Sequence, residues 1–335
     1  MGKTGQPRKG SMQFWPRKRA KKICPRVRSW PEGKEPSLLG FAGFKAGMTH
    51  VVYTDNRKAS TTKGDDIASP VTVIECPPIK IAAIKFYKKS IYGLKLKTQI
   101  NAPKWDKELE RKTIMPKKVD EKKITEIKPE DYTEIRVLAY TQPKLTGIGS
   151  KKPELFELGL GGNVAEQFAY AKDNLGKEVS VKDVFKEGEQ IDIHAVTIGK
   201  GFQGPVKRFG ITVQGRKKEK AKRNPGSLGP WKGQGHVMYR VAHAGQTGFH
   251  TRVEYNKWLM KIGEEGKEVT PRGGFLRYGE VKNPFILVKG SVGGSKKRIV
   301  RLVKAIRPNA KVPTEAPTIQ EISLASKQGN RVKSR

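Results

Sequence analysis

The chain has 335 residues, with 68 Lys or Arg against 32 Asp or Glu, which gives a formal net charge of +36. Self-repulsion on this scale predicts a polyanionic partner; RNA or DNA comes first, with an anionic membrane surface or an acidic protein as alternatives. No stretch approaches the ~18 apolar residues that cross a bilayer, and the N-terminus lacks the apolar core of a secretory signal. We therefore expect a cytoplasmic protein with no membrane partner.

Residues 1–36 are predicted to form a basic N-terminal arm. The first 31 residues hold ten Lys or Arg and no acid, and four prolines interrupt any regular period. Such a segment is expected to be disordered in the free chain and to become ordered against phosphates. Its tryptophans could stack on bases or pin the arm to the protein, and the sequence favours neither. The RNA-binding residues predicted here are Arg8, Lys9, Trp15, Arg17, Lys18, Arg19, Lys21 and Lys22.

Short apolar runs separated by turns then predict β-strands. The runs "LLGFAGFKAGMTHVVYTD" and "SPVTVIECPPIKIAAIKFY" come first, "IDIHAVTI" follows, and "NPFILVKGSVGGSKKRIVRLVKAI" closes the series. This pattern favours a mainly β fold with a small β-barrel over a doubly wound sheet. We expect the barrel to be built from residues 37–81, 184–198 and 262–307.

Residues 82–183 are predicted to form an α/β insert in this barrel. "YTEIRVLAY" is typical of a strand, and "NVAEQFAYAKDNLG" predicts a helix that Gly176 can cap. From Glu154 to Asp192 there are nine acids against four Lys and no Arg, so we expect the insert to face away from the polyanion. Residues 308–335, with three prolines, are predicted to form an extended C-terminal strap.

Residues 199–261 are predicted to form a basic, glycine-rich finger. Within it, "PVKRFGITVQGRKKEKAKRNPGSLGPWKGQGHVMYRVAHAGQTGFHTR" alternates cations with aromatic residues. Cations neutralise phosphates, and aromatic faces stack on unpaired bases for ~1 to 3 kcal/mol each. The predicted RNA-binding residues are Lys200, Lys207, Arg208, Arg216, Lys217, Lys218, Lys220, Lys222, Arg223, Trp231, Lys232, His236, Arg240, His243, His250 and Arg252, joined by Lys296, Lys297 and Arg298 near the last strand.

One motif invites an enzymatic interpretation. "GKGFQG", residues Gly199 to Gly204, fits G-x-G-x-x-G, but Pro205 follows directly and "PVKRFGITVQG" shows no helical period. A dinucleotide site needs a helix opening at that point. We therefore predict a glycine-rich turn, and no cofactor or small-molecule substrate.

The remaining chemistry-bearing residues give no stronger indication of catalysis. His236, His243 and His250 are seven residues apart, which matches no zinc motif, and the two cysteines form no C-x-x-C. We predict no metal site and no catalytic residue. A triad recognised only by geometry stays open at this point.

Several motifs in fixed order resemble one known family. These are "RKGSMQFWPRKRAKK", "LLGFAGFKAGMTHV", "SPVTVIECPPI", "VTIGKGFQGPVKRFGI", "GPWKGQGHVMYRVAHAGQTGFHTRVEYNK" and "ILVKGSVGGSKKRIV". Together they are similar to the universal large-subunit ribosomal protein three, in its archaeal and eukaryotic form. The short tail after Arg307 favours the archaeal form.

The resemblance implies a β-barrel of the translation-protein type at the subunit surface, an α/β insert and two extensions into large-subunit rRNA. It further implies early binding near the 3′ end of that rRNA, neighbouring large-subunit proteins as partners, and a structural, non-catalytic role. The finger then corresponds to the tryptophan finger of the family, whose tip approaches the peptidyl transferase centre and influences aminoacyl-tRNA accommodation. Trp231 is the corresponding tip residue, and Gly233 stands where relatives often carry proline.

Two alternatives belong to other classes of protein. An RNA-modifying enzyme would use the histidines of the finger and would show turnover by the isolated protein. A chromatin-like DNA binder would prefer duplex DNA over structured rRNA at a fixed salt concentration, because phosphate contacts make affinity salt-dependent.

Overall fold

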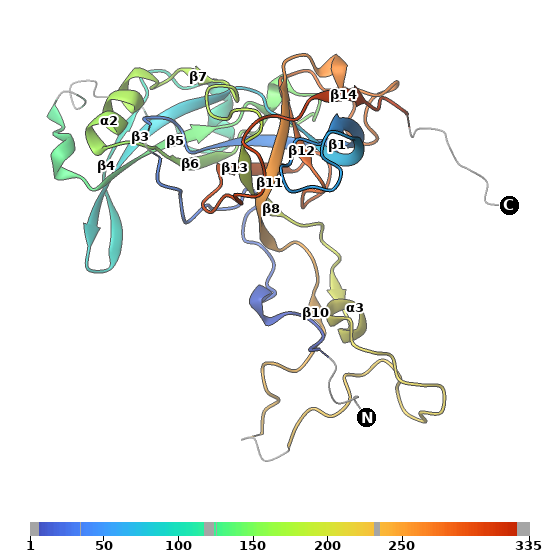
Figure 1. Cartoon of the computed structure of the whole chain (residues 1–335). Coiled ribbons are helices and arrows are strands. Elements are labelled where there is room, and N and C mark those ends of the chain that lie inside the picture. The colour runs from blue at the N-terminus through green and yellow to red at the C-terminus, as the bar shows by residue number, and fades with distance from the viewer. Residues whose placement is uncertain (1–6, 34, 117–123, 125, 231–234, 327–335) are drawn as a thin grey trace. The chain divides into compact units, whose positions relative to one another are not determined.

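The structure is a computed structural model that describes residues 7–33, 35–116, 124, 126–230 and 235–326. It is mainly β, as predicted, with few helices (Figure 1). The chain divides into two compact units. Unit 1 comprises Met1–Lys22 and Val196–Arg252, and unit 2 comprises Ile23–Ala195 and Val253–Arg335.

A closed ring of strands forms one part of unit 2. The sheet runs in the order β13-β8-β11-β12-β2-β1-β14, and β13 also pairs with β1, so that six strands close on themselves while β14 lies outside on β1. Closure leaves the ring without exposed strand edges. The strands are β1 (Gly40–Thr54), β2 (Asp66–Glu75), β8 (Gln190–Val196), β11 (Thr251–Gly263), β12 (Phe285–Lys289), β13 (Ile299–Lys304) and β14 (Ile319–Ile322).

Apolar runs fix the core of this ring. Phe285 to Val288 of β12 and Ile299 to Val303 of β13 are buried without interruption, as expected of strands covered on both faces. Gly43 of β1 allows close packing, because a Cβ there would lie 2.6 Å from Cγ2 of Ile74. A side chain at this position would force the two strands apart.

The insert contributes a second sheet to unit 2. It runs in the order β4-β3-β5-β6, with β7 also paired to β3. The helix α2 (Val164–Asp173) starts at a capping box formed by Asn163 and Glu166, and its Phe168 ring lies 5.9 Å from that of Phe86. The helix predicted in "NVAEQFAYAKDNLG" is confirmed as α2, and the strand predicted in "YTEIRVLAY" is confirmed as β5. The strands are β3 (Ile79–Ser90), β4 (Gly93–Asn101), β5 (Glu134–Tyr140), β6 (Leu155–Gly159) and β7 (Glu178–Val179).

Short elements complete the described chain. Two of them, β9 and β10, pair with each other in unit 1. The others are helices of three to five residues. In chain order, the short strands and helices are η1 (Met12–Phe14), η2 (Lys107–Arg111), η3 (Pro129–Asp131), η4 (Pro143–Leu145), β9 (Phe202–Gln203), α3 (Pro205–Phe209), β10 (Gly245–Gln246) and η5 (Gly266–Glu268).

Three local features of the structure were not specified by the sequence expectations. The strand β11 begins at Thr251, within the residues predicted as the finger, and pairs with β12 from Leu259 to Gly263. The strap contributes β14 to the same sheet. A helix, α3, begins at Pro205 where none was expected, because proline suits the first position of a helix, where its missing N–H costs nothing.

Candidate nucleic-acid interface

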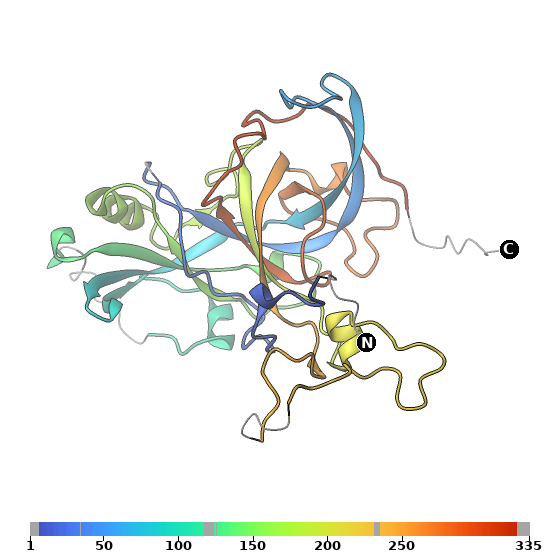
Figure 2. The ribbon, with the colours of Figure 1, turned by 60° about the horizontal axis from the view of Figure 1, so that its bottom comes forward.

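Unit 1 concentrates positive charge. It holds 20 of the chain's 68 Lys and Arg but one of its 32 acids, Glu219, and so contributes +19 of the net charge of +36. Figure 2 shows the chain of unit 1 leaving α3 in a long yellow loop and returning in an orange one. This part of the molecule is the one that a polyanion would contact first.

Backbone pairing holds the two ends of the finger together. The N–H of Thr197 donates to the carbonyl of His250 at 3.0 Å, and the N–H of Lys200 donates to that of Thr247 at 2.9 Å. The short strands β9 and β10 continue this ladder. The residues before 204 and after 244 therefore form an ordered base from which the loop extends.

Two arginines tie the N-terminal arm to this base. Arg208 donates from Nε to the Gln246 carbonyl at 3.1 Å and from Nη1 to the His243 carbonyl at 2.9 Å. Arg17 donates to the Arg208 carbonyl at 2.5 Å, and Arg208 donates back to the Arg17 carbonyl at 3.4 Å. Backbone carbonyls thus occupy both guanidinium groups, which leaves them fewer donors for phosphate.

Both arginines lie over a buried aromatic ring. The Cζ atoms of Arg17 and Arg208 lie 4.3 and 5.1 Å from the centre of the Phe209 ring. Burial lowers the pKa of both guanidinium groups, and the neighbouring charges of Arg8 and Arg17 add to the effect on Arg17 and Arg208 respectively. The cost of crowding these cations is partly offset by the ring and the carbonyls.

The tryptophans of the arm pack on the protein. The Trp15 ring lies 5.8 Å from that of Phe209 and 6.1 Å from that of Tyr239. In unit 2, Trp30 packs against the core, and a Cβ on Gly159 would lie 2.8 Å from its ring. Of the two roles left open by the sequence, this geometry favours pinning of the arm.

Most other predicted RNA-binding residues of unit 1 are exposed. None of them forms an ion pair with an acid among the residues that the structure describes. Lys218 and Arg252 are half-buried. The exposed set is Arg8, Lys9, Lys18, Arg19, Lys21, Lys22, Lys200, Lys207, Arg216, Lys217, Lys220, Lys222, Arg223, His236, Arg240 and His243.

The histidines do not share one environment. His250 is 7% exposed, and its Nδ1 lies 2.7 Å from the Lys18 carbonyl, which gives it a structural role in joining the arm to the base. His236 and His243 are exposed. His194 lies in unit 2, where burial and the charge of Arg301 lower its pKa. The structure therefore does not present these histidines as one set of catalytic groups.

Five predicted residues need separate mention. Trp231 and Lys232 lie outside the described residues. In unit 2, Lys297 is exposed, whereas Lys296 donates to the Leu276 carbonyl at 2.6 Å. Arg298 is half-buried, which lowers its pKa.

The sequence interpretation also missed exposed aromatic residues. Phe202 on β9 is 77% exposed between Lys200 and Lys207, and Phe14 is half-exposed under the guanidinium of Arg252, 5.1 Å from its Cζ. Exposed aromatic faces among cations are typical of proteins that bind single-stranded nucleic acid. The alternation of aromatic and basic residues around Phe14 and Phe202 was the available signal.

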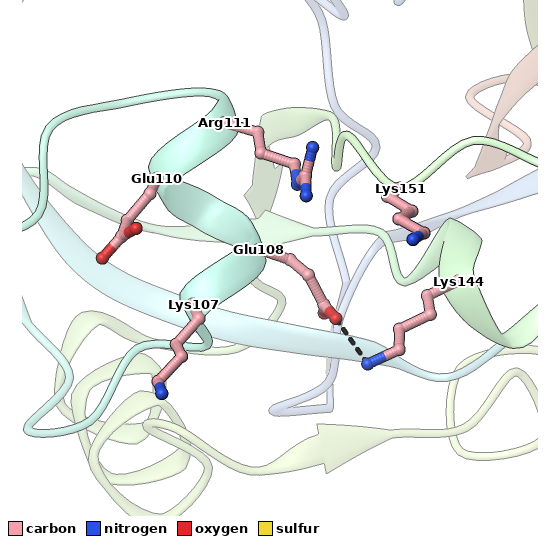
Figure 3. A pocket seen from close by; sticks show the side chains of 6 residues that line it. All are labelled: Lys107, Glu108, Glu110, Arg111, Lys144 and Lys151. Atoms are coloured by element: carbon pink, nitrogen blue, oxygen red, sulfur yellow. Dashed lines mark ion pairs between the residues drawn. The ribbon is translucent and has the colours of Figure 1, made fainter.

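An open hollow of about 540 Å³ lies on the insert in unit 2. Figure 3 shows Glu108 and Lys144 pointing toward each other across it, and their charged atoms are 2.8 Å apart. Mixed charges that pair with one another in an open depression do not resemble a catalytic pocket. It is lined by Lys107, Glu108, Glu110, Arg111, Lys144 and Lys151.

Membrane-spanning helices and metal sites are the remaining features to consider among the described residues. No helix among them has the length and apolar composition that a bilayer requires. Within those same residues, no group of three or more His, Cys, Asp or Glu is arranged to hold a metal ion.

Comparison with known proteins agrees with this picture of the chain. Residues 1–329 match the family described as Ribosomal protein L3. The large ribosomal subunit protein uL3 of Archaeoglobus fulgidus is 50% identical over 331 residues, which cover 98% of this chain and 99% of the relative. That of Methanococcus vannielii is 49% identical over 333 residues, covering 98% and 99% of the two chains. The chain therefore belongs to the ribosomal protein L3 family.

Proposed function

We propose that this chain is a structural, non-catalytic constituent of the large ribosomal subunit and binds large-subunit rRNA through unit 1. The observation that carries the proposal is the set of exposed cations on that unit that make no ion pair among the described residues, taken with membership of the family. Each phosphate contact releases counterions, so these cations supply affinity. The paired Arg17 and Arg208 hold the arm and the finger base in place for that contact.

The finer parts of the proposal rest on the family resemblance. The finger would extend toward the peptidyl transferase centre, with Trp231 at its tip, and would modulate the accommodation of aminoacyl-tRNA. The chain would join the subunit early in assembly, contact other large-subunit proteins, and act in the cytoplasm as part of the ribosome. Lys297 would add a contact to RNA from unit 2, where it is exposed.

Competition binding tests the proposal against a DNA-binding role. At one fixed salt concentration, the full chain is expected to prefer transcribed large-subunit rRNA over duplex DNA of the same nucleotide content. The triple variant Lys217→Gln, Lys218→Gln and Lys220→Gln should reduce the salt slope of log affinity by about 2 to 3, since each lost contact contributes ~0.7 to 0.9. Preference for duplex DNA would contradict the proposal.

A matched variant separates local contact from total charge. Lys172, Lys177 and Lys186 are exposed in the acidic part of unit 2. Their replacement by Gln removes the same three charges. We expect an unchanged salt slope for this control, whereas an equal reduction would mean that net charge alone governs binding.

A further inference from the structure

The hairpin of β3 and β4 ends in an unusual turn. Ser90 pairs with Gly93, so Ile91 and Tyr92 are the two residues of the turn. The Ser90 hydroxyl donates to the Gly93 carbonyl at 2.9 Å, and Gly93 has a φ of +104°. The positive φ lies at Gly93, and neither Ile91 nor Tyr92 has one. The turn itself therefore does not require a large apolar side chain at either position.

The end of this hairpin is a free two-stranded ribbon. β5 pairs with β3 only as far as Tyr87, and beyond that point β4 is the partner of β3. Figure 1 shows the hairpin projecting beyond the rest of its sheet. A short ribbon without a third strand is marginal in water by itself.

Large apolar side chains at the end of this ribbon are exposed to solvent. Ile91 is 100% exposed and Tyr92 is 90% exposed, and Leu94 and Leu96 follow at 42% and 46%. Such a group on one projecting element marks an interaction surface, because single exposed apolar residues are common but contiguous ones are not.

Charge identifies the kind of partner. Residues 79–105 contain seven Lys and no acid. Lys88 and Lys95 stand directly opposite each other, and like charges in that position destabilise a strand pair. The Nζ of Lys95 lies 5.5 Å from the centre of the Tyr92 ring. An anion between these lysines would remove the repulsion.

Two other lysines of residues 79–105 form ion pairs with nearby acids. Lys80 lies 3.1 Å from Asp106, and Lys85 lies 2.6 Å from Glu157. Lys88, Lys89, Lys95 and Lys97 are exposed and make no ion pair among the described residues. Four of the five lysines of residues 79–105 that make no ion pair among the described residues thus lie at the projecting end, and the fifth is Lys104.

We infer that the hairpin end, residues 88–97, is a further RNA-binding surface on the insert, separate from unit 1. Tyr92 stacks on an unpaired base, and Lys88 and Lys95 contact phosphates on either side of it. RNA fits better than a protein partner, because lysine is depleted from protein–protein interfaces. The inference rests on the proposed function, and it replaces the expectation that the whole insert faces away from the polyanion.

Photocrosslinking in assembled large subunits tests this inference. The full chain carries p-benzoylphenylalanine in place of Tyr92, and a second preparation carries it in place of Lys217 in unit 1. We expect crosslinks to rRNA from both positions. If position 217 reaches rRNA while position 92 reaches a protein or nothing, the hairpin inference fails and the proposed function stands. Failure at position 217 with a crosslink at position 92 would support the hairpin and overturn the assignment to unit 1.

Binding to transcribed large-subunit rRNA gives an independent readout. Tyr92→Ser is expected to weaken affinity about 5- to 150-fold through the lost stack. Lys88→Gln with Lys95→Gln should reduce the salt slope by about 1.4 to 1.8. The matched pair Lys172→Gln with Lys177→Gln should leave it unchanged. Unchanged binding by the hairpin variants, with thermal unfolding like the parent's, would overturn the inference.

Discussion

Arg17 and Arg208 carry the same charge as their exposed neighbours but stand in a different environment. Their donors are directed at backbone carbonyls of the arm and of the finger base, and both lie over Phe209. Lys207, the residue next to Arg208, is exposed. Adjacent cations therefore differ in role, because Arg208 donates to backbone carbonyls whereas Lys207 is exposed to solvent.

Replacement of Arg208 and replacement of Lys207 are expected to have different effects. Arg208→Ala leaves the carbonyls of His243 and Gln246 without their donor, at a cost of ~1 to 3 kcal/mol. Hydrogen exchange at residues 243–250 should become faster. Lys207→Ala should leave exchange unchanged and lower the salt slope of rRNA binding by ~0.7 to 0.9. Faster exchange in both variants would contradict this difference in role.

The sequence could not predict that difference in role. Arg17 and Arg208 are 191 residues apart, and basic composition describes both exposed and paired arginines equally. Trp15 presented the same difficulty, because its partners Phe209 and Tyr239 are distant in sequence. Composition indicated the binding unit, and only long-range packing shows which of its residues are structural.

Among the elements, the strands were the most predictable. Runs such as "FILV" are buried throughout β12, and apolar runs of that kind indicate a strand. The first half of β11 is polar and partly exposed, so its residues resembled the finger. The hairpin end does not stand out in the sequence, because the acidic stretch from Glu154 to Asp192 dominates the charge of the insert and the lysines of the hairpin lie before it.

The loop beyond α3 is an element with little internal support. Between 211 and 230, described backbone hydrogen bonds join Gln214 to Lys222 and Lys218 to Gly215. Few apolar side chains are buried there. Segments of this kind open at low cost in free energy.

Limited trypsin digestion should detect this difference between elements. Without RNA, we expect rapid cleavage between Arg216 and Arg223 and slow cleavage in the ring strands. Addition of transcribed large-subunit rRNA should protect the loop. Resistance of residues 211–230 in the free protein would contradict the low internal support of this loop, and cleavage unaffected by rRNA would contradict binding through it.

At the scale of the whole molecule, charge is divided unevenly between the units. Unit 1 contributes +19 of the net charge of +36 with a single acid, whereas unit 2 holds the other 31 acids and both buried sheets. The repulsion among the cations of unit 1 destabilises its compact state, and a bound polyanion would reduce that repulsion. Unit 2 supplies the apolar core that the basic unit lacks.

Sedimentation of cell extracts tests the central claim most directly. Cell extracts are brought to moderate salt and separated on a gradient, and the chain is detected in each fraction. It is predicted to co-sediment with the large subunit, and to be released when the rRNA is digested with ribonuclease. Recovery at the top of the gradient, or with DNA after the same wash, would contradict binding to large-subunit rRNA.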